Sequence, residues 1–119
     1  MKADIRYCSI FDVMNKKVID KSITDFIDLI KENYSDVESV YVFGSYARDN
    51  SAPESDIDLA IVFGKLDDTK RFDIQVQLMM LATQIDTRIE PHPISLDDFS
   101  SSGNPFITEI KKTGYEIFS

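Results

Sequence analysis

The chain has 119 residues and carries 13 Lys and Arg against 21 Asp and Glu, so its formal net charge is −8 at neutral pH. Its hydrophobic residues, 43% of the total, can form one core, and we expect a single domain over residues 1–119. One Cys and one His exclude an internal disulfide and a structural zinc site, and the acidic charge disfavours direct nucleic-acid binding through a broad basic face.

The first part of the chain has an unclear pattern that gives way to a helix. Residues 1–20 mix helical and strand periods, so we treat them as a poorly readable N-terminal extension that holds a short strand or helix. From Ser22 a helical pattern begins, and it should end near Asn33. The apolar residues on one face of this predicted helix are Ile23, Phe26, Ile27 and Ile30.

Two predicted strands follow, separated by a polar loop. Residues 39–43 are β-branched and aromatic, which is typical of a buried strand, and Gly44 ends them. Residues 48–55 are polar and rich in turn-forming residues, so they should form a loop. Residues 56–63 form the second strand, whose apolar second half indicates a central position in a sheet.

A second helix is predicted between about Thr69 and Gln84, followed by a third strand. The apolar residues at helical spacing, with the methionines as core filler, are Phe72, Val76, Met79, Met80 and Leu81. Residues 85–89 alternate enough for a strand, which Pro91 and Pro93 should end.

The last elements are a helix and a short closing strand. Pro105 suits the first turn of a helix, Gly114 should stop that helix, and residues 115–118 form the strand. The resulting order is helix, strand, strand, helix, strand, helix and short strand. It predicts an α+β domain, close to α/β, with a small mixed sheet.

Two carboxylates stand at the entrance of the second predicted strand. Side chains two residues apart on a strand face the same side, so Asp56 and Asp58 should lie next to each other. Like charges at that distance raise each other's pKa and require neutralisation. Such oxygen ligands suit Mg²⁺, which completes its shell with water and substrate phosphates; a solvated strand entrance is the alternative.

A candidate phosphate site precedes these acids. If Ser45 opens a helical turn after Gly44, its hydroxyl and the following amides point at an anion, whereas an ordinary Gly-Ser turn is the alternative. Arg48 could contact a phosphate oxygen or serve as a structural ion-pair partner. Because the two strands should be neighbours, the phosphate donors and the metal ligands should meet at one edge of the sheet.

The spacing of these residues resembles the signature of a known family. Gly44-Ser45, ten intervening residues and Asp56-x-Asp58 are similar to the motif of the polymerase-beta-like nucleotidyltransferase superfamily. The fuller strings, residues 44–48 and 55–59, resemble its small stand-alone members, the minimal nucleotidyltransferase (MNT) antitoxins. The resemblance implies the polymerase-beta-like fold, a small mixed sheet flanked by helices. It also implies transfer of a nucleoside monophosphate from a nucleoside triphosphate, with release of pyrophosphate.

The family's functional residues can be carried over onto matching positions. The resemblance implies that Gly44 and Ser45 hold the leaving phosphates, with Arg48 as a further nucleotide-binding residue. Asp56 and Asp58 would be catalytic carboxylates that bind two Mg²⁺ ions.

A third carboxylate, on a later strand, would complete the catalytic and metal-binding set. Glu90 is the favoured residue because it stands at the predicted strand end before Pro91. Asp86 is its competitor, since strict alternation places Asp86 and Glu90 on one strand face. His92 is either an ordinary loop histidine or a contact to the metal ligands or the substrate.

The resemblance also suggests a partner. Stand-alone members resemble antitoxins that silence an all-helical HEPN (higher eukaryotes and prokaryotes nucleotide-binding) RNase toxin by adding AMP to a tyrosine. We therefore expect a cytoplasmic, Mg²⁺-dependent protein adenylyltransferase that uses ATP and has no membrane partner, since no apolar run is long enough to span a bilayer. The alternatives are a non-catalytic binding antitoxin with a vestigial metal site, and a homo-oligomeric, dimeric nucleotidyltransferase of small molecules such as antibiotics.

Overall fold

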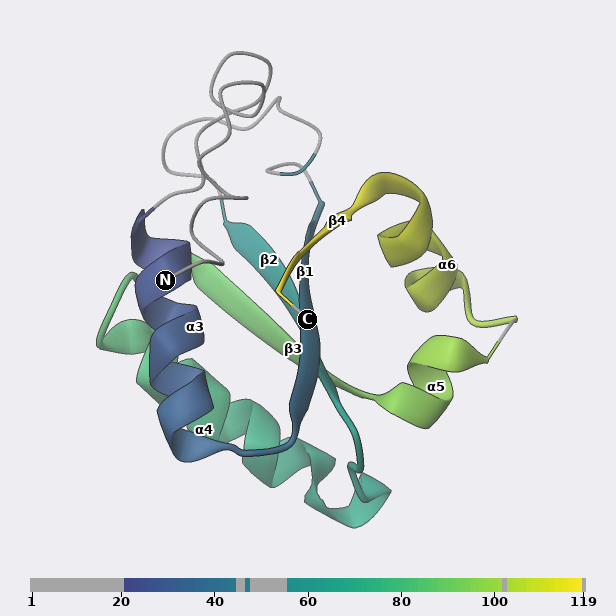
Figure 1. The fold of residues 1–119 in the computed structure, drawn as a ribbon, viewed down its shortest axis with the longest axis horizontal. Helices are drawn as coiled ribbons and strands as arrows, with labels where there is room; N and C mark the ends of the chain where they lie inside the picture. Colours follow the sequence, from purple (N-terminus) through teal and green to yellow (C-terminus); the bar gives the residue numbers. More distant parts are fainter. Residues whose placement is uncertain (1–20, 45–46, 48–55, 102, 119) are drawn as a thin grey trace.

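The computed structural model describes residues 21–44, 47, 56–101 and 103–118, in which a four-stranded mixed sheet lies between two helical layers (Figure 1). The strands are β1 (Val37–Phe43), β2 (Ile57–Phe63), β3 (Ile89–Ser95) and β4 (Tyr115–Phe118), in the order β3-β2-β1-β4. β1 is antiparallel to β2 and β4, whereas β2 and β3 are parallel. The α+β class, the mixed sheet and the central position of β2 are therefore confirmed.

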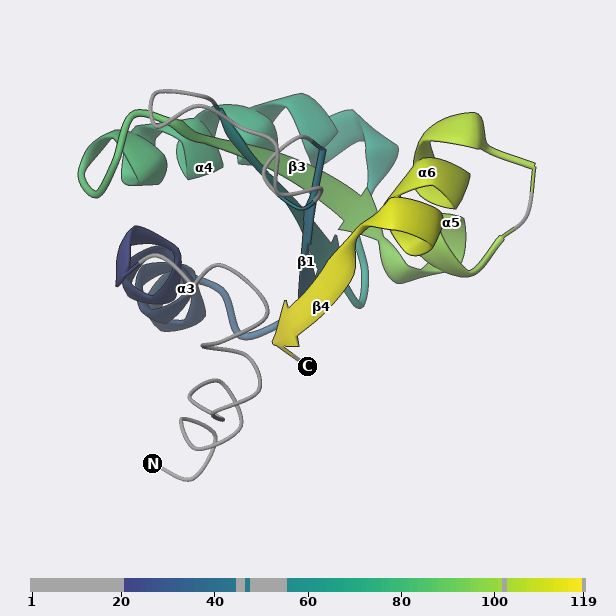
Figure 2. The same cartoon turned by 90° about the horizontal axis from the view of Figure 1, so that it is seen from above.

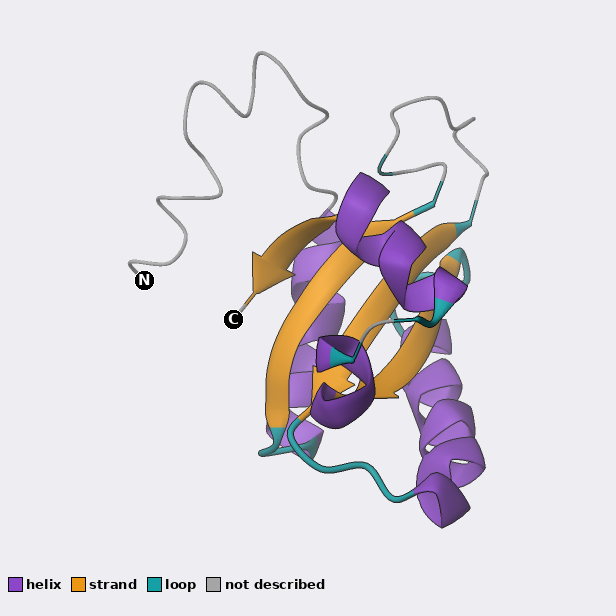
Figure 3. Cartoon of the chain, turned by 90° about the vertical axis from the view of Figure 1, so that its right-hand side faces the viewer, coloured by secondary structure: helices purple, strands orange, loops and turns teal. Residues whose placement is uncertain are grey.

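The helices divide between the two faces of the sheet (Figure 2). Helices α3 (Lys21–Asn33) and α4 (Arg71–Thr83) cover one face, and the short 3₁₀ helix η1 (Asp68–Lys70) precedes α4. Helices α5 (Leu96–Ser100) and α6 (Pro105–Thr113) cover the other face, which is turned toward the viewer in Figure 3. Within the described ranges, no helix has the length and apolar character needed to cross a membrane.

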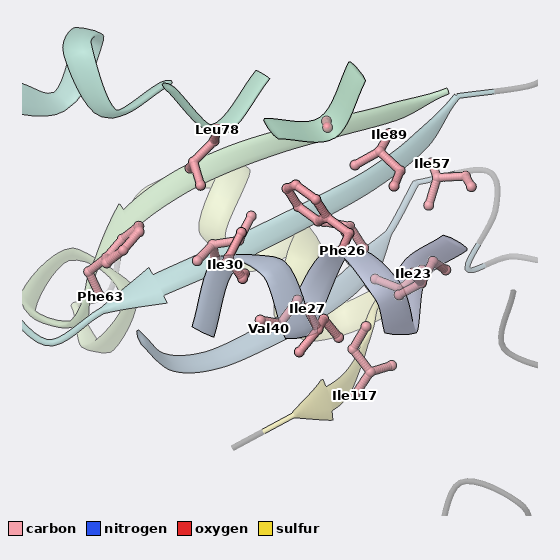
Figure 4. Close-up of a cluster of buried hydrophobic side chains, with 14 residues drawn as sticks. Ile23, Phe26, Ile27, Ile30, Val40, Ile57, Phe63, Leu78, Ile89 and Ile117 are labelled. Atoms are coloured by element: carbon pink, nitrogen blue, oxygen red, sulfur yellow. The ribbon is translucent and has the colours of Figure 1, made fainter. Parts of the chain in front are cut away.

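The main core lies between the sheet, α3 and α4 (Figure 4). The apolar face predicted for the first helix is confirmed, because its four residues are all buried there. In β2, Ile57, Leu59 and Ile61 point into this core, so Asp58 and the alternate residues point toward α5 and α6. The apolar pattern of β2 thereby fixes the face of the sheet on which Asp58 stands.

The predicted position of the third strand is wrong, because β3 begins at Ile89 and runs through both prolines. Pro91 and Pro93 fit because β3 is an edge strand that pairs only with β2 among the described strands. The backbone N–H of Ile57 in β2 donates to the carbonyl of Arg88, and along a strand the backbone groups of successive residues point alternately to its two edges. Because Arg88 faces β2, Pro91 and Pro93, at odd distances from it, turn their backbone groups to the open edge. There α4 covers them: Gln75 Nε2 donates to the Pro91 carbonyl at 2.6 Å.

The second predicted helix is confirmed as α4, but its predicted core face is wrong. Leu78 and Ala82 are the buried residues of α4, with Leu81 partly buried beside them. The other four predicted core residues, Phe72, Val76, Met79 and Met80, are exposed. The helix is apolar on both sides, so periodicity alone could not select the side that faces the sheet.

The C-terminal prediction is confirmed, since Pro105 opens α6 and Gly114 follows its last residue. A Cβ added to Gly114 would lie 2.6 Å from the Val42 carbonyl oxygen, so glycine is required by the close approach of β1. The predictions for residues 1–20 and for the loop at 48–55 lie outside the described residues.

Candidate functional site

The site begins with two carboxylates that the parallel pairing of β2 and β3 brings together. Asp58 and Glu90 are register partners near the start of these strands. Residues directly opposite in a sheet project to the same face, so both side chains lie on the α5 and α6 side. Asp58 is half-buried and Glu90 is exposed, which places the pair at the rim of the sheet and open to a ligand.

Asp56 adds a third carboxyl group to the pair. It lies one residue before β2, and its carboxyl group is close enough to that of Glu90 to raise the pKa of Glu90. Partial desolvation of its carboxyl group raises the pKa of Glu90, and the neighbouring carboxyl groups of Asp56 and Asp58 raise it further, against the opposing effect of His92. Ionisation of Glu90 beside the other two acids is therefore unfavourable unless a cation neutralises the charge.

His92 contributes a nitrogen donor to the same group. Its Nε2 lies 3.3 Å from Oδ1 of Asp58, and its ring packs against Phe43 and Phe106, with centroids 5.3 Å and 5.8 Å away. Potential ligand atoms of Asp58, Glu90 and His92 all lie within 4.8 Å of one another. The loop placement of His92 is thus wrong, and its side chain contacts an acid of the site.

The contact of His92 with Asp58 could have been found from the sequence once β3 was placed correctly. Glu90 and His92 are two residues apart on β3, so strand alternation puts them on one face. The strand predicted from the sequence ends before Pro91 and therefore does not include His92. The aromatic contacts of His92 join β1, β3 and α6, and no local sequence signal indicates them.

Gly44 brings the end of β1 against Asp58. Its φ of 80° lies in the left-handed region that favours glycine, and a Cβ added to it would lie 2.6 Å from Oδ2 of Asp58. The backbone conformation therefore favours glycine, and a side chain at this position would also displace the Asp58 carboxylate. The end of β1, where we predicted the phosphate site, thus adjoins the carboxylates. Ser45 and Arg48, the other predicted nucleotide-binding residues, lie outside the described part of the chain.

Asp86 does not join the acidic group. It lies in the turn between α4 and β3, where its carboxylate accepts hydrogen bonds from Arg88 Nη2 at 2.7 Å and from the Ser22 hydroxyl at 2.8 Å. These hydrogen bonds, above all those from Arg88, hold the pKa of Asp86 well below its usual range despite partial burial. Of the two candidates for the third carboxylate, only Glu90 stands beside Asp58.

The donor set fits a hard divalent cation. Asp56, Asp58 and Glu90 offer carboxylate oxygens, the ligand type that Mg²⁺ and Mn²⁺ accept, and the negative charges of Asp56 and Asp58 contribute to the raised pKa of Glu90. The group is also open on one side, so a bound cation could share its remaining positions with water or phosphate oxygens. The arrangement suits chemistry in which developing negative charge on phosphate must be stabilised.

Comparisons with known proteins agree with this geometry. Residues 25–119 match the family described as Polymerase beta, Nucleotidyltransferase. The chain is 30% identical, over 114 residues, to a candidate protein adenylyltransferase of Methanocaldococcus jannaschii, and the match covers 87% of this chain and 74% of the relative.

Two solved structures have a similar fold. One is a candidate nucleotidyltransferase from Sulfolobus solfataricus, with 21% identity, a TM-score of 0.59 and coverage of 81% of this chain and 76% of the other. The second contains the tri-AMPylated HEPN toxin of Shewanella oneidensis in complex with its MNT antitoxin; here the identity is 20%, the TM-score is 0.52, and the coverage is 81% of this chain and 68% of the other.

Proposed function

This chain belongs to the polymerase beta nucleotidyltransferase family, and on that premise we propose that it transfers AMP from ATP to a tyrosine hydroxyl of a helical HEPN-type toxin, which it thereby silences. The observation that carries the proposal is the grouping of Asp58, Glu90 and His92 beside the glycine turn at Gly44, with Asp56 near enough to raise the pKa of Glu90. The protein adenylyltransferase name of the archaeal relative and the AMPylated toxin in the Shewanella complex support a protein acceptor.

The residues have separate roles in the proposed reaction. Asp56, Asp58 and Glu90 would hold Mg²⁺, with two ions expected, and Gly44, Ser45 and Arg48 would contact the triphosphate. When bound, Mg²⁺ neutralises phosphate oxygens and stabilises the attacking and leaving oxygens. His92 keeps the Asp58 carboxylate oriented through its 3.3 Å contact, and its own ring is held by Phe43 and Phe106.

The bond changes follow from the chemistry of phosphoryl transfer. The acceptor oxygen forms a bond to the α-phosphorus of ATP, and the bond from that phosphorus to the pyrophosphate oxygen breaks. The hydroxyl proton passes to the carboxylate of Asp58 or Glu90, directly or through solvent. Pyrophosphate leaves with the bonding electron pair, and the product is an AMP ester of the acceptor.

The test is AMP transfer to a helical HEPN-type protein, the acceptor of this proposal. With ATP and Mg²⁺, intact-mass spectrometry should show the acceptor gaining one or more AMP units on tyrosine. Asp58→Asn should slow the transfer at least about a thousandfold, because it removes several kcal/mol of charge stabilisation. The exposed Asp28→Asn on α3 is the matched control and should leave the rate unchanged.

Two outcomes would contradict the proposal. If the acceptor gained no AMP at any concentration, the chain would not be its adenylyltransferase. If Asp58→Asn still neutralised the toxin in cells at equal dose, the chain would act by binding alone.

A further inference from the structure

The outer face of α4 is apolar and exposed. The side chains that form it, which we call the α4 surface, are Phe72, Val76, Met79 and Met80, with relative exposures of 75%, 38%, 49% and 64%. Their spacing of four, three and one residues puts them on one side of the helix, opposite Leu78 and Ala82, which pack on the sheet. Such a continuous stripe differs from the scattered single apolar residues that normally occur on protein surfaces.

In the described part of the chain, the outer faces of the other two long helices, α3 and α6, are mainly polar, with Phe106 on α6 as an exposed apolar residue. On α3, the exposed positions include Asp28, Lys31 and Glu32, and on α6 they include Lys111 and Lys112. An apolar face of a helix is normally covered by a neighbouring element. Helix α4 has two such faces, and in the described part of the chain only the one toward the sheet is covered.

The α4 surface lies along the edge of the sheet that carries Glu90. The hydrogen bonds from Arg71 Nη1 to the Pro93 carbonyl and from Gln75 Nε2 to the Pro91 carbonyl show that α4 runs antiparallel to β3. Four helical residues span about 6 Å, nearly the same length as two strand residues. By this spacing Met79, one turn after Gln75, stands at the level of Ile89, next to Glu90. A protein bound to this surface therefore lies at the level of the β3 residues next to Glu90, with α4 between it and the sheet.

Charge decides which occupant fits this surface. Asp73 borders it, Lys70 precedes the helix, and the one basic residue of α4, Arg71, is already paired with Asp68 and Asp98, so the chain's net charge of −8 is what a partner meets. A second copy of this chain would bring another net charge of −8 against these acids, which is unfavourable. A helix with an apolar stripe and flanking Lys or Arg would satisfy both the apolar area and the acidic border.

We propose that the α4 surface docks the protein acceptor, through an amphipathic helix of that protein whose apolar stripe is bordered by basic residues. The proposal rests on the proposed function, because it takes the acceptor to be a helical protein. Docking at α4 holds the acceptor beside the β3 edge, from which its tyrosine-bearing segment reaches around to Glu90. The surface thus supplies recognition that the small carboxylate site cannot provide.

The test pairs a surface variant with a matched control. Phe72→Glu combined with Met80→Glu should weaken binding of the helical HEPN-type acceptor about a hundredfold or more in calorimetry, since central apolar residues dominate interface affinity. AMP transfer to that protein at subsaturating concentration should fall in parallel. Leu96→Glu, on α5 at the other face of the sheet, also replaces an exposed apolar residue and should change neither. Because the substituted residues are exposed, both variants should keep the wild-type thermal midpoint.

The outcomes separate this inference from the proposed function. Wild-type binding and transfer by the Phe72→Glu, Met80→Glu variant would overturn the α4 surface as the docking site while leaving the enzymatic proposal intact. If neither the wild type nor any variant transferred AMP, but the surface variant still lost binding, the enzymatic proposal alone would be overturned. A wild-type homodimer in light scattering that the same substitutions dissociate would assign the surface to a second copy and contradict the inference.

Discussion

Glu90 lowers the stability of the metal-free fold, although it belongs to the candidate site. Burial and the neighbouring acids raise its pKa, so the folded chain binds a proton at Glu90 more strongly than the unfolded chain does. The stability linked to this proton is fully present below the ordinary glutamate pKa and is lost as pH rises through the raised value. At neutral pH and without metal, ionised Glu90 is therefore a destabilising residue.

Glu90→Gln should consequently raise the thermal midpoint of the metal-free protein at pH 7.5, because the amide removes the repulsion. The difference from the wild type should shrink as pH falls toward the ordinary carboxyl range. Differential scanning fluorimetry in EDTA checks both parts, with the exposed Glu32→Gln on α3 as a control that should not change the midpoint. A lower midpoint for Glu90→Gln at pH 7.5 would show that Glu90 stabilises the fold instead.

The acid pair and the glycine turn could be predicted from sequence because their signals are local. Alternation within one strand puts Asp56 and Asp58 on one face, and a glycine that ends a strand marks the turn. The contact between Gly44 and Asp58 also follows once β1 and β2 are taken as neighbours. The choice between Asp86 and Glu90 required the register of β3, and that register depends on tertiary pairing.

At the scale of elements, Asp86 joins α3 to the start of β3. Its carboxylate accepts from Ser22 in the first turn of α3, and it forms an ion pair with Arg88 just before β3. Ion pairs and hydrogen bonds of this kind matter most where solvent is largely excluded, and the Asp86 side chain is only 17% exposed. This junction helps to set the register of β3 against β2, and hence the position of Glu90 opposite Asp58.

Asp86→Asn should lower the free energy of unfolding by about 1 to 3 kcal/mol at pH 7, because it weakens hydrogen bonds to a charged partner. The low pKa of Asp86 contributes stability above its ordinary value, near 4, and that stability is lost as pH falls through the lower folded-state value. The variant and the wild type should therefore converge in acid. Urea unfolding at several pH values measures this difference.

Asp25→Asn is the matched control for this junction, because Asp25 pairs with Lys21 at the surface of α3 and should be worth about 0.5 kcal/mol or less. Equal losses for the two variants would remove the special role of Asp86.

The errors in the element predictions also have physical causes. Proline weakens a strand that needs its N–H groups on both sides, but β3 pairs on one side and lends its outer carbonyls to α4. The core side of α4 could not be assigned, because apolar residues line both of its sides and only packing shows which one meets the sheet. Elements with one apolar face, such as α3, were predicted correctly.

At the scale of the whole molecule, the larger hydrophobic core and the candidate site lie on opposite faces of the sheet. The face of the sheet covered by α3 and α4 contains the larger core, whereas the carboxylates stand at the end of the opposite face. The acidic site and the acidic overall charge both disfavour polyanions unless cations are present. Divalent cation binding is therefore the property on which nucleotide binding and AMP transfer depend.

The central claim is that Asp58 and Glu90 hold a divalent cation which carries the nucleotide. Isothermal titration calorimetry of Mn²⁺ together with a non-hydrolysable ATP analogue tests it most directly. We predict binding by the wild type and by Asp86→Asn, and at least about tenfold weaker binding by Asp58→Asn and by Glu90→Gln. Unchanged affinity in both site variants, or no binding by the wild type, would contradict the account.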